Sequence, residues 1–287
     1  METTRIDITK YVKSGEGANG ESYNSIEDNN EMLKLYSVGY DTSDIETELD
    51  VAKKAYDNGF PVPKPGELIT DGERIGIRFW RIPNKTSFAR AIGDNPDMVE
   101  ELTRKFARMC RHFHTIECKE GVFTDAKEQF LQLLEYDTVF NKEEKKKIAD
   151  FIRATPDTVT AVHGDMHVGN AVMSGDFKAD YDSCNLYWID LGSFAVGNPL
   201  FDLGMMYIVC VVDGDDFIYE NMHSHKETAE KVWEYFVSEY FDGKLTLQEA
   251  DELIKPYAAI KTLLIERNLG GVLFPDFEDL FRTTILK

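Results

Sequence analysis

The chain has 287 residues, of which 43 % are hydrophobic and 12 % aromatic, so it is long enough for one large domain or two lobes with buried cores. It carries 52 Asp and Glu residues against 32 Lys and Arg residues, a formal net charge of −20. Such a charge repels nucleic acid and anionic membrane surfaces, and it favours solubility and the attraction of cations.

No stretch approaches the roughly 18 apolar residues that a membrane span needs, and the first residues lack the apolar core of a signal peptide. The four cysteines are scattered and form no CxxC pair, as expected for reduced thiols. We therefore expect a cytoplasmic monomer or homodimer that binds neither nucleic acid nor membrane.

The first eighty residues predict a small sheet with one helix. Residues 11–38 contain two half-alternating runs, joined by a turn at residues 28–30. A helix is expected over residues 44–60, where its apolar residues share one face and Gly59 ends it. Residues 61–82 then predict two strands around an Asp-Gly hairpin turn.

After Pro83 the pattern becomes mainly helical. Helices are expected over residues 97–116, 127–140, 143–155, 226–241 and 251–269, with two short strands over residues 170–174 and 186–190. We therefore predict an α+β fold with two lobes, residues 1–82 and residues 83–287, and a hinge near residues 80–84. The junction of two lobes is the usual place for a ligand cleft.

Residues 15–20 form a G-x-G-x-x-G run with glycines at Gly15, Gly17 and Gly20. The run stands between two strand-like segments, whereas a dinucleotide-binding fold needs it at a strand-to-helix turn. A glycine-rich hairpin can instead lie over phosphates and present backbone N–H groups to them. The alternative is an ordinary flexible turn.

Lys34 follows the run on the second strand of the predicted hairpin. Because side chains alternate along a strand, Lys34 can point toward a ligand while its apolar neighbours point into the core; the alternative is an exposed lysine. A lysine that lines a cleft needs a carboxylate partner, and the next helix offers Glu46 and Glu48. We favour Glu48, which lies about one helical turn before the packed residue Ala52.

The segment HGDMHVGN, residues 163–170, places Asp165 between two histidines. Gly164 argues against a helix here, so His163 and His167 do not match a helical zinc pair despite their spacing of four. A loop of this kind could direct Asp165 toward an alcohol as a base. The alternative is a turn-forming aspartate with histidines that serve as buried hydrogen-bonding groups.

Two further residues have the chemistry of magnesium ligands. Asn170 offers a neutral oxygen at the start of a strand, and Asp190 offers a carboxylate at the end of one, close to Gly192. The order of glycine run, strand lysine, helix glutamate, loop aspartate with Asn five residues later, and Asp-x-Gly is typical of phosphoryl transfer.

The segment HGDMHVGN also matches, at every fixed position, the loop H-G-D-x-H-x-x-N of the aminoglycoside phosphotransferase / choline kinase family, and the chain resembles that family from about Gly15 to Gly204. The segments IDLGSFAVGNPLFDLG and ARMCRHFHTIEC resemble the family's metal-aspartate segment and the helix before its central region. The resemblance implies a bilobal protein-kinase-like fold. It also implies ATP- and Mg²⁺-dependent transfer of the γ-phosphate to a hydroxyl of a small molecule, such as an aminoglycoside, amino alcohol or sugar-like compound.

The resemblance assigns the nucleotide to residues of the first lobe: Gly15, Gly17, Gly20, Lys34 paired with Glu48, and hinge backbone groups at Trp80 and Ile82. It assigns Mg²⁺ to Asn170 and Asp190. The hinge sequence FWRIP lacks the acidic residue of many relatives, so GTP stays open beside ATP.

The resemblance makes Asp165 the catalytic aspartate, with support for its loop from His163, His167 and Asp202. Asp202 could instead cap the following helix, and both roles are compatible. The acceptor site is expected after Pro199, where Asp215 and Asp216 lie in the acidic and aromatic run DGDDFIYEN. Such a run suits a cationic or polyhydroxylated acceptor.

Two other functions compete with this interpretation. A catalytically inactive nucleotide-binding regulator would be expected to lack at least one of the four key residues Lys34, Asp165, Asn170 and Asp190, and all are present. A zinc hydrolase built on His163, His167 and Asp165 would leave the glycine run and the lysine unused.

Overall fold

The computed structural model describes residues 2–17, 19–178, 184–268 and 270–287, and the chain divides into two compact units. The first unit comprises Met1–Thr86 and Val172–Ser193, and the second comprises Ser87–Ala171 and Phe194–Lys287. This division differs from the predicted boundary at residue 82, because a segment expected in the helical lobe, Val172–Ser193, belongs to the first unit. Of the loop over residues 174–185, residues 179–183 lie outside the described part.

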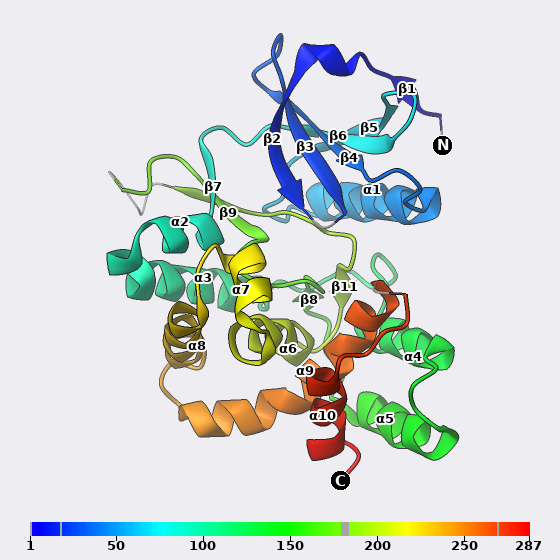
Figure 1. Ribbon diagram of the computed structural model, residues 1–287, viewed down its shortest axis with the longest axis vertical. Helices are drawn as coiled ribbons and strands as arrows, with labels where there is room; N and C mark the ends of the chain where they lie inside the picture. Colours follow the sequence, from blue (N-terminus) through cyan, green and yellow to red (C-terminus); the bar gives the residue numbers. More distant parts are fainter. Residues whose placement is uncertain (1, 18, 179–183, 269) are drawn as a thin grey trace. The chain divides into compact units, whose positions relative to one another are not determined.

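The first unit is built on a six-stranded sheet in the order β1-β5-β6-β4-β3-β2, with helix α1 (Thr42–Asp57) alongside it (Figure 1). All neighbours are antiparallel except β1 and β5. The strands are β1 (Thr4–Arg5), β2 (Tyr11–Gly17), β3 (Gly20–Ser25), β4 (Glu31–Tyr36), β5 (Pro65–Thr70) and β6 (Ile75–Trp80), and a 3-10 turn, η1 (Ile8–Lys10), precedes β2.

Residues 11–38 form three strands where two runs were predicted, because the glycine run makes a tight hairpin of its own between β2 and β3. Lys34 therefore lies on the third strand, β4, opposite Ser22 of β3 and Ile77 of β6. Because side chains alternate along β4, its residues pack into different clusters on the two faces of the sheet. Leu33 and Leu35 are fully buried in one cluster, while Tyr36 packs with α1 on the other face.

A three-stranded sheet, β10-β9-β7, explains why Val172–Ser193 joins the first unit. Its strands are β7 (Lys85–Ser87), β9 (Ala171–Ser174) and β10 (Asn185–Trp188). The Ser174 hydroxyl donates to the Pro83 carbonyl at 2.7 Å, and the Trp188 N–H donates to the Pro61 carbonyl at 2.8 Å. These contacts join segments far apart in the sequence, so local periodicity does not predict them.

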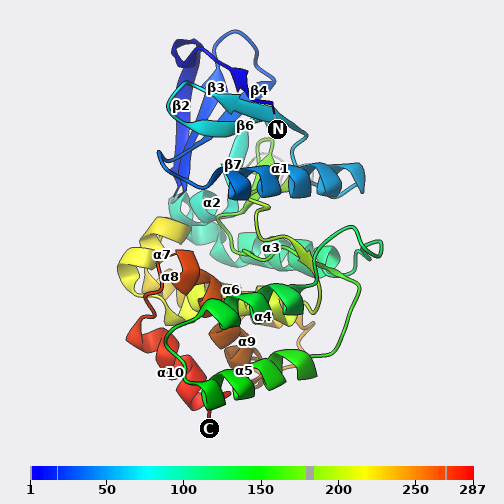
Figure 2. The ribbon, with the colours of Figure 1, turned by 90° about the vertical axis from the view of Figure 1, so that its right-hand side faces the viewer.

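The second unit is mainly helical, and Figure 2 shows several of its helices side by side, including α4 and α5. Its elements are α2 (Phe88–Asp94), η2 (Pro96–Met98), α3 (Val99–Phe113), α4 (Ala126–Tyr136), α5 (Lys142–Ala154), β8 (Ala161–Val162), β11 (Ala195–Val196), α6 (Leu200–Tyr207), a π-helical turn η3 (Ile208–Val212), α7 (Asp215–Met222), α8 (Lys226–Tyr240), α9 (Leu247–Asn268) and α10 (Pro275–Thr283). Strands β8 and β11 pair antiparallel, and β8 directly precedes the HGDMHVGN loop while β11 precedes α6.

Helices α6 and α9 pack closely at the centre of the second unit. A Cβ on Gly204 of α6 would lie 2.7 Å from the backbone of Tyr257 on α9, so a glycine is needed for this approach. Within the described residues, no helix is long and apolar enough to span a membrane.

Candidate functional site

The glycine-rich hairpin joins β2 to β3, and its glycines meet different surroundings. A Cβ on Gly20 would lie 2.2 Å from the Leu35 carbonyl oxygen, so Gly20 is needed for the approach of β3 to β4. A Cβ on Gly17 would meet no described heavy atom within 4 Å, and one on Gly15 would make an ordinary contact with Ser22. Gly17 is therefore the glycine that leaves its backbone open to a ligand.

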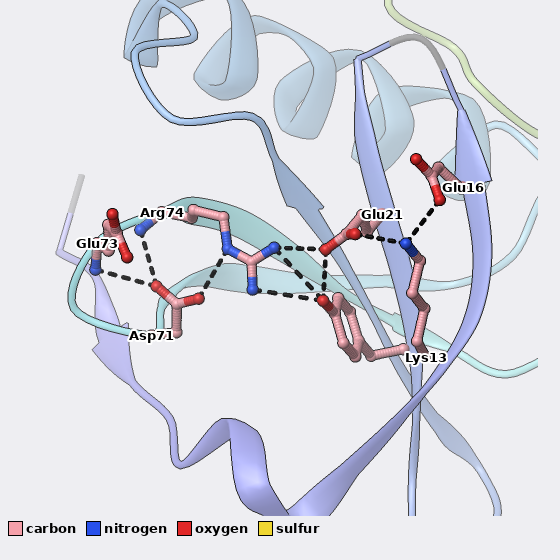
Figure 3. A network of polar contacts seen from close by, with 7 residues as sticks. Lys13, Glu16, Glu21, Asp71, Glu73 and Arg74 are labelled. Atoms are coloured by element: carbon pink, nitrogen blue, oxygen red, sulfur yellow. Dashed lines mark hydrogen bonds and ion pairs between the residues drawn. The ribbon is translucent and has the colours of Figure 1, made fainter.

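A network of charged side chains holds this hairpin to the neighbouring strands (Figure 3). Glu16 and Glu21 face each other across β2 and β3, and the Lys13 Nζ lies 2.6 Å from one carboxylate and 2.5 Å from the other. The Arg74 guanidinium lies 2.6 Å from Glu21 and 2.8 Å from Asp71. Hydrogen bonds, the first of them from Lys13, lower the pKa of Glu21 to about 2. The network neutralises a like-charge pair beside the glycines.

Lys34 contacts two carboxylates of the first unit. Its Nζ lies 2.7 Å from Glu48 Oε1 on α1 and 3.1 Å from Asp190 Oδ1, which follows β10. Burial lowers the pKa of Lys34, but the charges of Asp190 and Glu48 outweigh it and hold that pKa well above its usual range. One ammonium cannot balance two carboxylates, and burial followed by the charge of Asp190 raises the pKa of Glu48 despite Lys34. The cluster therefore brings two carboxylates to one ammonium.

Asp190 has a left-handed backbone with a φ of +62°. Residues other than glycine rarely adopt this conformation, and strained residues of this kind are concentrated at functional sites. The strain turns the chain directly after β10 and leaves the Asp190 side chain 39 % exposed beside the lysine. Asp190 is thus oriented by its backbone as well as by its ion pair.

The predicted hinge residues lie at the end of β6. The Trp80 N–H already donates to the Lys64 carbonyl at 2.9 Å, and its ring lies 6.3 Å from that of Tyr187. Ile82 is buried, with 3 % of its surface exposed. The N–H groups of Trp80 and Arg81 are therefore both committed, the second of them to the Asn30 carbonyl at 2.7 Å.

In the second unit, the HGDMHVGN loop is almost wholly buried. His163 and Met166 are fully enclosed, and His167 and Asn170 are less than 9 % exposed. Gly164 has a φ of +80°, which a glycine adopts without strain. The Asp165 side chain is the exception, with 35 % of its surface exposed. The loop thus presents one carboxylate to its surroundings.

Both loop histidines use ring nitrogens to hold the loop's own backbone. The Nδ1 of His163 accepts from the Asp165 N–H at 3.2 Å, and the Nδ1 of His167 accepts from the Gly169 N–H at 3.1 Å. The Nδ2 of Asn170 donates to the carbonyl and the carboxylate of Asp165, both at 2.9 Å. The Oδ1 of Asn170 is then the atom with the chemistry to bind a metal ion.

Asp202 lies in the first turn of α6 and is fully buried. Its carboxylate accepts from the N–H groups of His163 and Gly164, both at 2.7 Å, and pairs with the Nε2 of His114 at 3.0 Å. Burial alone would raise the pKa of Asp202, but the contacts with His114 and His163 outweigh it and lower that pKa. The N-cap position of α6 is occupied by Pro199, so Asp202 binds the loop rather than its own helix end.

Two buried polar residues near the loop, His114 and Lys261, could not be predicted from the sequence. His114 ends the α3 segment and links Asp202 to the Tyr240 hydroxyl, which lies 2.7 Å from its Nδ1. The only signal in the sequence was the resemblance of this segment to a family helix. Lys261 of α9 is a buried lysine in an apolar pattern, and nothing local distinguishes it from a helix-surface lysine.

The two predicted acceptor residues differ in their environment. The Asp215 carboxylate accepts from the N–H of Lys226 and contacts the Nδ1 of His225, both at 2.9 Å, so it holds the start of α8. Asp216 is exposed, as are the nearby rings of Phe217 and Tyr219. Asp216 is the freer of the two carboxylates to meet a ligand.

Among the described residues, no group of three or more His, Cys, Asp or Glu side chains is arranged to hold a metal ion. A magnesium ion on phosphates needs only one or two protein ligands, and the partly exposed carboxylate of Asp190 has the chemistry of such a ligand. Asn170 belongs to the second unit and Asp190 to the first.

A family model described as "Phosphotransferase enzyme family" matches residues 15–235 of this chain, well over half of its length. The match includes the glycine run, Lys34, the HGDMHVGN loop and Asp190. No curated protein sequence gave a significant match.

Solved structures with this fold include three that cover most of the chain. Aminoglycoside phosphotransferase APH(3'')-Id from Streptomyces rimosus, solved with ADP and streptomycin, is 14 % identical over 88 % of this chain and 92 % of its own, with a TM-score of 0.55. A thermostable mutant of APH(4)-Ia, solved with ADP and hygromycin B, is 10 % identical over 95 % and 93 %, with a TM-score of 0.61. A choline/ethanolamine kinase family protein from Mesorhizobium loti is 14 % identical over 95 % and 86 %, with a TM-score of 0.52. The predicted kinase-like α+β fold is confirmed.

Proposed function

Because the chain belongs to the phosphotransferase enzyme family, we propose that it transfers the γ-phosphate of ATP to a hydroxyl group of a small molecule. The observation that carries the proposal is the loop of residues 163–170, in which His163 and Asn170 hold the one exposed carboxylate, that of Asp165. A carboxylate within reach of an acceptor hydroxyl can orient it and accept its proton as the phosphoryl group moves.

The first unit supplies the groups that would bind the nucleotide. The ammonium of Lys34 is held by two carboxylates and would contact the phosphates, with the open backbone at Gly17 above them. The hinge segment, at Trp80 and Ile82, would offer backbone groups to the adenine. Two of the compared structures hold ADP, which supports ATP rather than GTP as the donor.

Asp190 and Asn170 have the oxygen ligands that Mg²⁺ prefers, and we assign them as the residues that would hold it. When bound, the ion would neutralise negative charge on the phosphates. We expect Asp190→Ala to abolish the enhancement of nucleotide binding by Mg²⁺, because the variant loses the anionic ligand and Asn170 is neutral. A nucleotide titration with and without Mg²⁺ measures this, and equal enhancement in the variant and the wild type would rule out Asp190 as a ligand.

The acceptor is proposed to be hydroxylated and cationic. The compared structures bind streptomycin and hygromycin B, or belong to a choline/ethanolamine kinase family. In this chain Asp216 is exposed on α7, and so are the rings of Phe217 and Tyr219 on the same helix, a composition that suits an amine. Asp215 is assigned the lesser role, since its carboxylate already caps α8.

The proposal is tested by measuring ATP consumption with Mg²⁺ over a panel of aminoglycosides, amino alcohols and sugars. We expect at least one hydroxylated amine to raise consumption far above the rate with water alone, with one phosphate added to it. Tight nucleotide binding without turnover on any member would favour the inactive regulator instead.

A further inference from the structure

Lys261 is a buried amine in the core of the second unit. It lies on α9 with 1 % of its surface exposed, and its Nζ has no hydrogen-bond partner among the described residues. Its Nζ lies 5.9 Å from the centroid of the Phe130 ring, a weak cation–π contact. Burying an amine without a partner is costly, because the group loses its hydration. Stability alone does not explain a lysine in such a place.

The position of Lys261 connects it to the loop of residues 163–170. The Phe130 ring packs on Phe201 of α6, with 5.0 Å between centroids, and Phe201 precedes Asp202. Tyr257, one turn before Lys261 on α9, packs on the same Phe201 ring at 5.5 Å. Lys261 therefore lies next to the side chains that pack against Phe201 of α6, and the next residue of that helix, Asp202, holds the loop.

The charges around Lys261 belong to the loop and its support. Burial holds the pKa of Lys261 below its usual range, and the charges of Asp165 and then Asp202 oppose this effect and favour the charged amine. Asp202 already has three close partners, two backbone N–H groups and His114. The Asp165 carboxylate has the Nδ2 of Asn170 at 2.9 Å, and the Nε2 of His167 lies further away at 3.9 Å. A positive charge in the core acts over several ångströms, because protein screens it less than water does.

We propose that Lys261 is a positioning residue for phosphoryl transfer, whose buried positive charge holds the Asp165 carboxylate in its working orientation from behind α6. The proposal rests on the proposed function of Asp165. It accounts for an unpartnered amine that a purely structural core would replace with an apolar side chain, since functional sites retain groups that cost stability.

The test compares Lys261→Met, which keeps the length of the side chain and removes its charge, with the wild type in hydrolysis of Mg-ATP, water serving as acceptor. We expect kcat to fall about tenfold with the KM for ATP unchanged, because a charge near the reacting carboxylate is lost. We expect the unfolding midpoint to rise by about 2 °C or more, because an unpaired buried amine is gone. A variant that gains stability and keeps full kcat would overturn the proposal.

Two further variants make the outcome specific. Lys261→Arg keeps the charge, so its kcat should recover toward that of the wild type, and an Arg variant as slow as the Met variant would also overturn the proposal. Lys255→Met is the matched control, because Lys255 lies on the same helix, is partly exposed and has its Nζ 6.0 Å from the centroid of the Tyr207 ring, so its kcat should not change. An Asp165→Asn variant with normal turnover would refute the proposed function itself, whereas an inactive Asp165→Asn beside a fully active Lys261→Met would refute only the role of Lys261.

Discussion

The two carboxylate contacts of Lys34 have different origins, one in local strand and helix geometry and one in long-range strand pairing. Alternation along β4 turns it to the face that α1 covers, and there Glu48 reaches its ammonium at 2.7 Å. The second carboxylate, Asp190, is 156 residues away and is brought to the lysine by the β7-β9-β10 sheet and a left-handed turn. The pairing with Glu48 could be predicted from helix geometry, while the contact with Asp190 depends on long-range strand pairing.

Substitutions of Gly17 and Gly20 should have different effects, one on ATP binding and the other on stability. Gly20→Ala should lower the free energy of unfolding by about 1–3 kcal/mol, because its methyl group would collide with the Leu35 carbonyl. Gly17→Ala should change stability by less than about 0.5 kcal/mol and weaken ATP binding, because the methyl group enters open space above the proposed phosphates. Urea unfolding and an ATP titration measure the two effects. Equal stability loss in both variants would contradict this division of roles.

The roles of individual buried polar residues could not be predicted from the sequence. His114 and Lys261 both act on residues distant in the sequence, Asp202 and the loop of residues 163–170. Their importance comes from burial, and burial is decided by the packing of α3, α6 and α9 rather than by local pattern. The loop itself could be predicted, because its dense polar sequence departs from any strand or helix pattern.

At the scale of elements, the long helices follow directly from their periodicity. The structure places α3, α5 and α8 within a few residues of the predicted ranges, and α5 begins with a capping box, Asn141–Glu144. The sequence did not predict the third strand around the glycine run or the grouping of Val172–Ser193 with the first unit. Both depend on which strands pair, and pairing partners are chosen by tertiary structure.

A carboxyl pair joins α9 to the segment after α4 and predicts pH-dependent stability. Burial, with the charge and hydrogen bond of Asp137, raises the pKa of Glu266 to about 7. An unfolded glutamate has a pKa of about 4.3, so the folded state favours the protonated form. The stabilisation from this proton is fully present below about pH 4 and is lost as the pH rises through about 7.

Glu266→Gln should remove this dependence, because an amide does not titrate. Between pH 5 and pH 8, the free energy of unfolding of the wild type should fall relative to that of the variant, as measured by urea unfolding at several pH values. Asp137→Asn serves as a second variant, because it removes the neighbouring charge. Parallel pH profiles for the wild type and Glu266→Gln would show that this pair does not share a proton.

At the scale of the whole molecule, the family match confirms the predicted enzyme class, a phosphotransferase with an alcohol group as acceptor. The net charge of −20 is not needed for ATP, whose phosphates are anionic and require cations. An acidic surface would instead attract a cationic acceptor and speed its encounter with the protein. Composition could indicate this attraction, but it cannot identify the acceptor.

The acidity of the chain predicts salt-dependent kinetics for such an acceptor. Its KM should rise with ionic strength, because the Debye length shortens to about 8 Å near 0.15 M salt. Asp216→Asn should raise the KM further, and Asp215→Asn should do so less, since that carboxylate caps α8. A KM that is indifferent to salt and to both substitutions would make the acidity a property of solubility alone.

The central claim is that Asp165 orients the acceptor for phosphoryl transfer, and Asp165→Asn tests it most directly. The asparagine keeps the size of the side chain and removes its charge, in a loop whose other contacts are unchanged. We predict that ATP binding stays at the wild-type level, while turnover falls by roughly 10²–10⁴, the usual range for a positioned acid–base group. Near-normal turnover in the variant, measured beside the wild type with the same acceptor, would contradict the account.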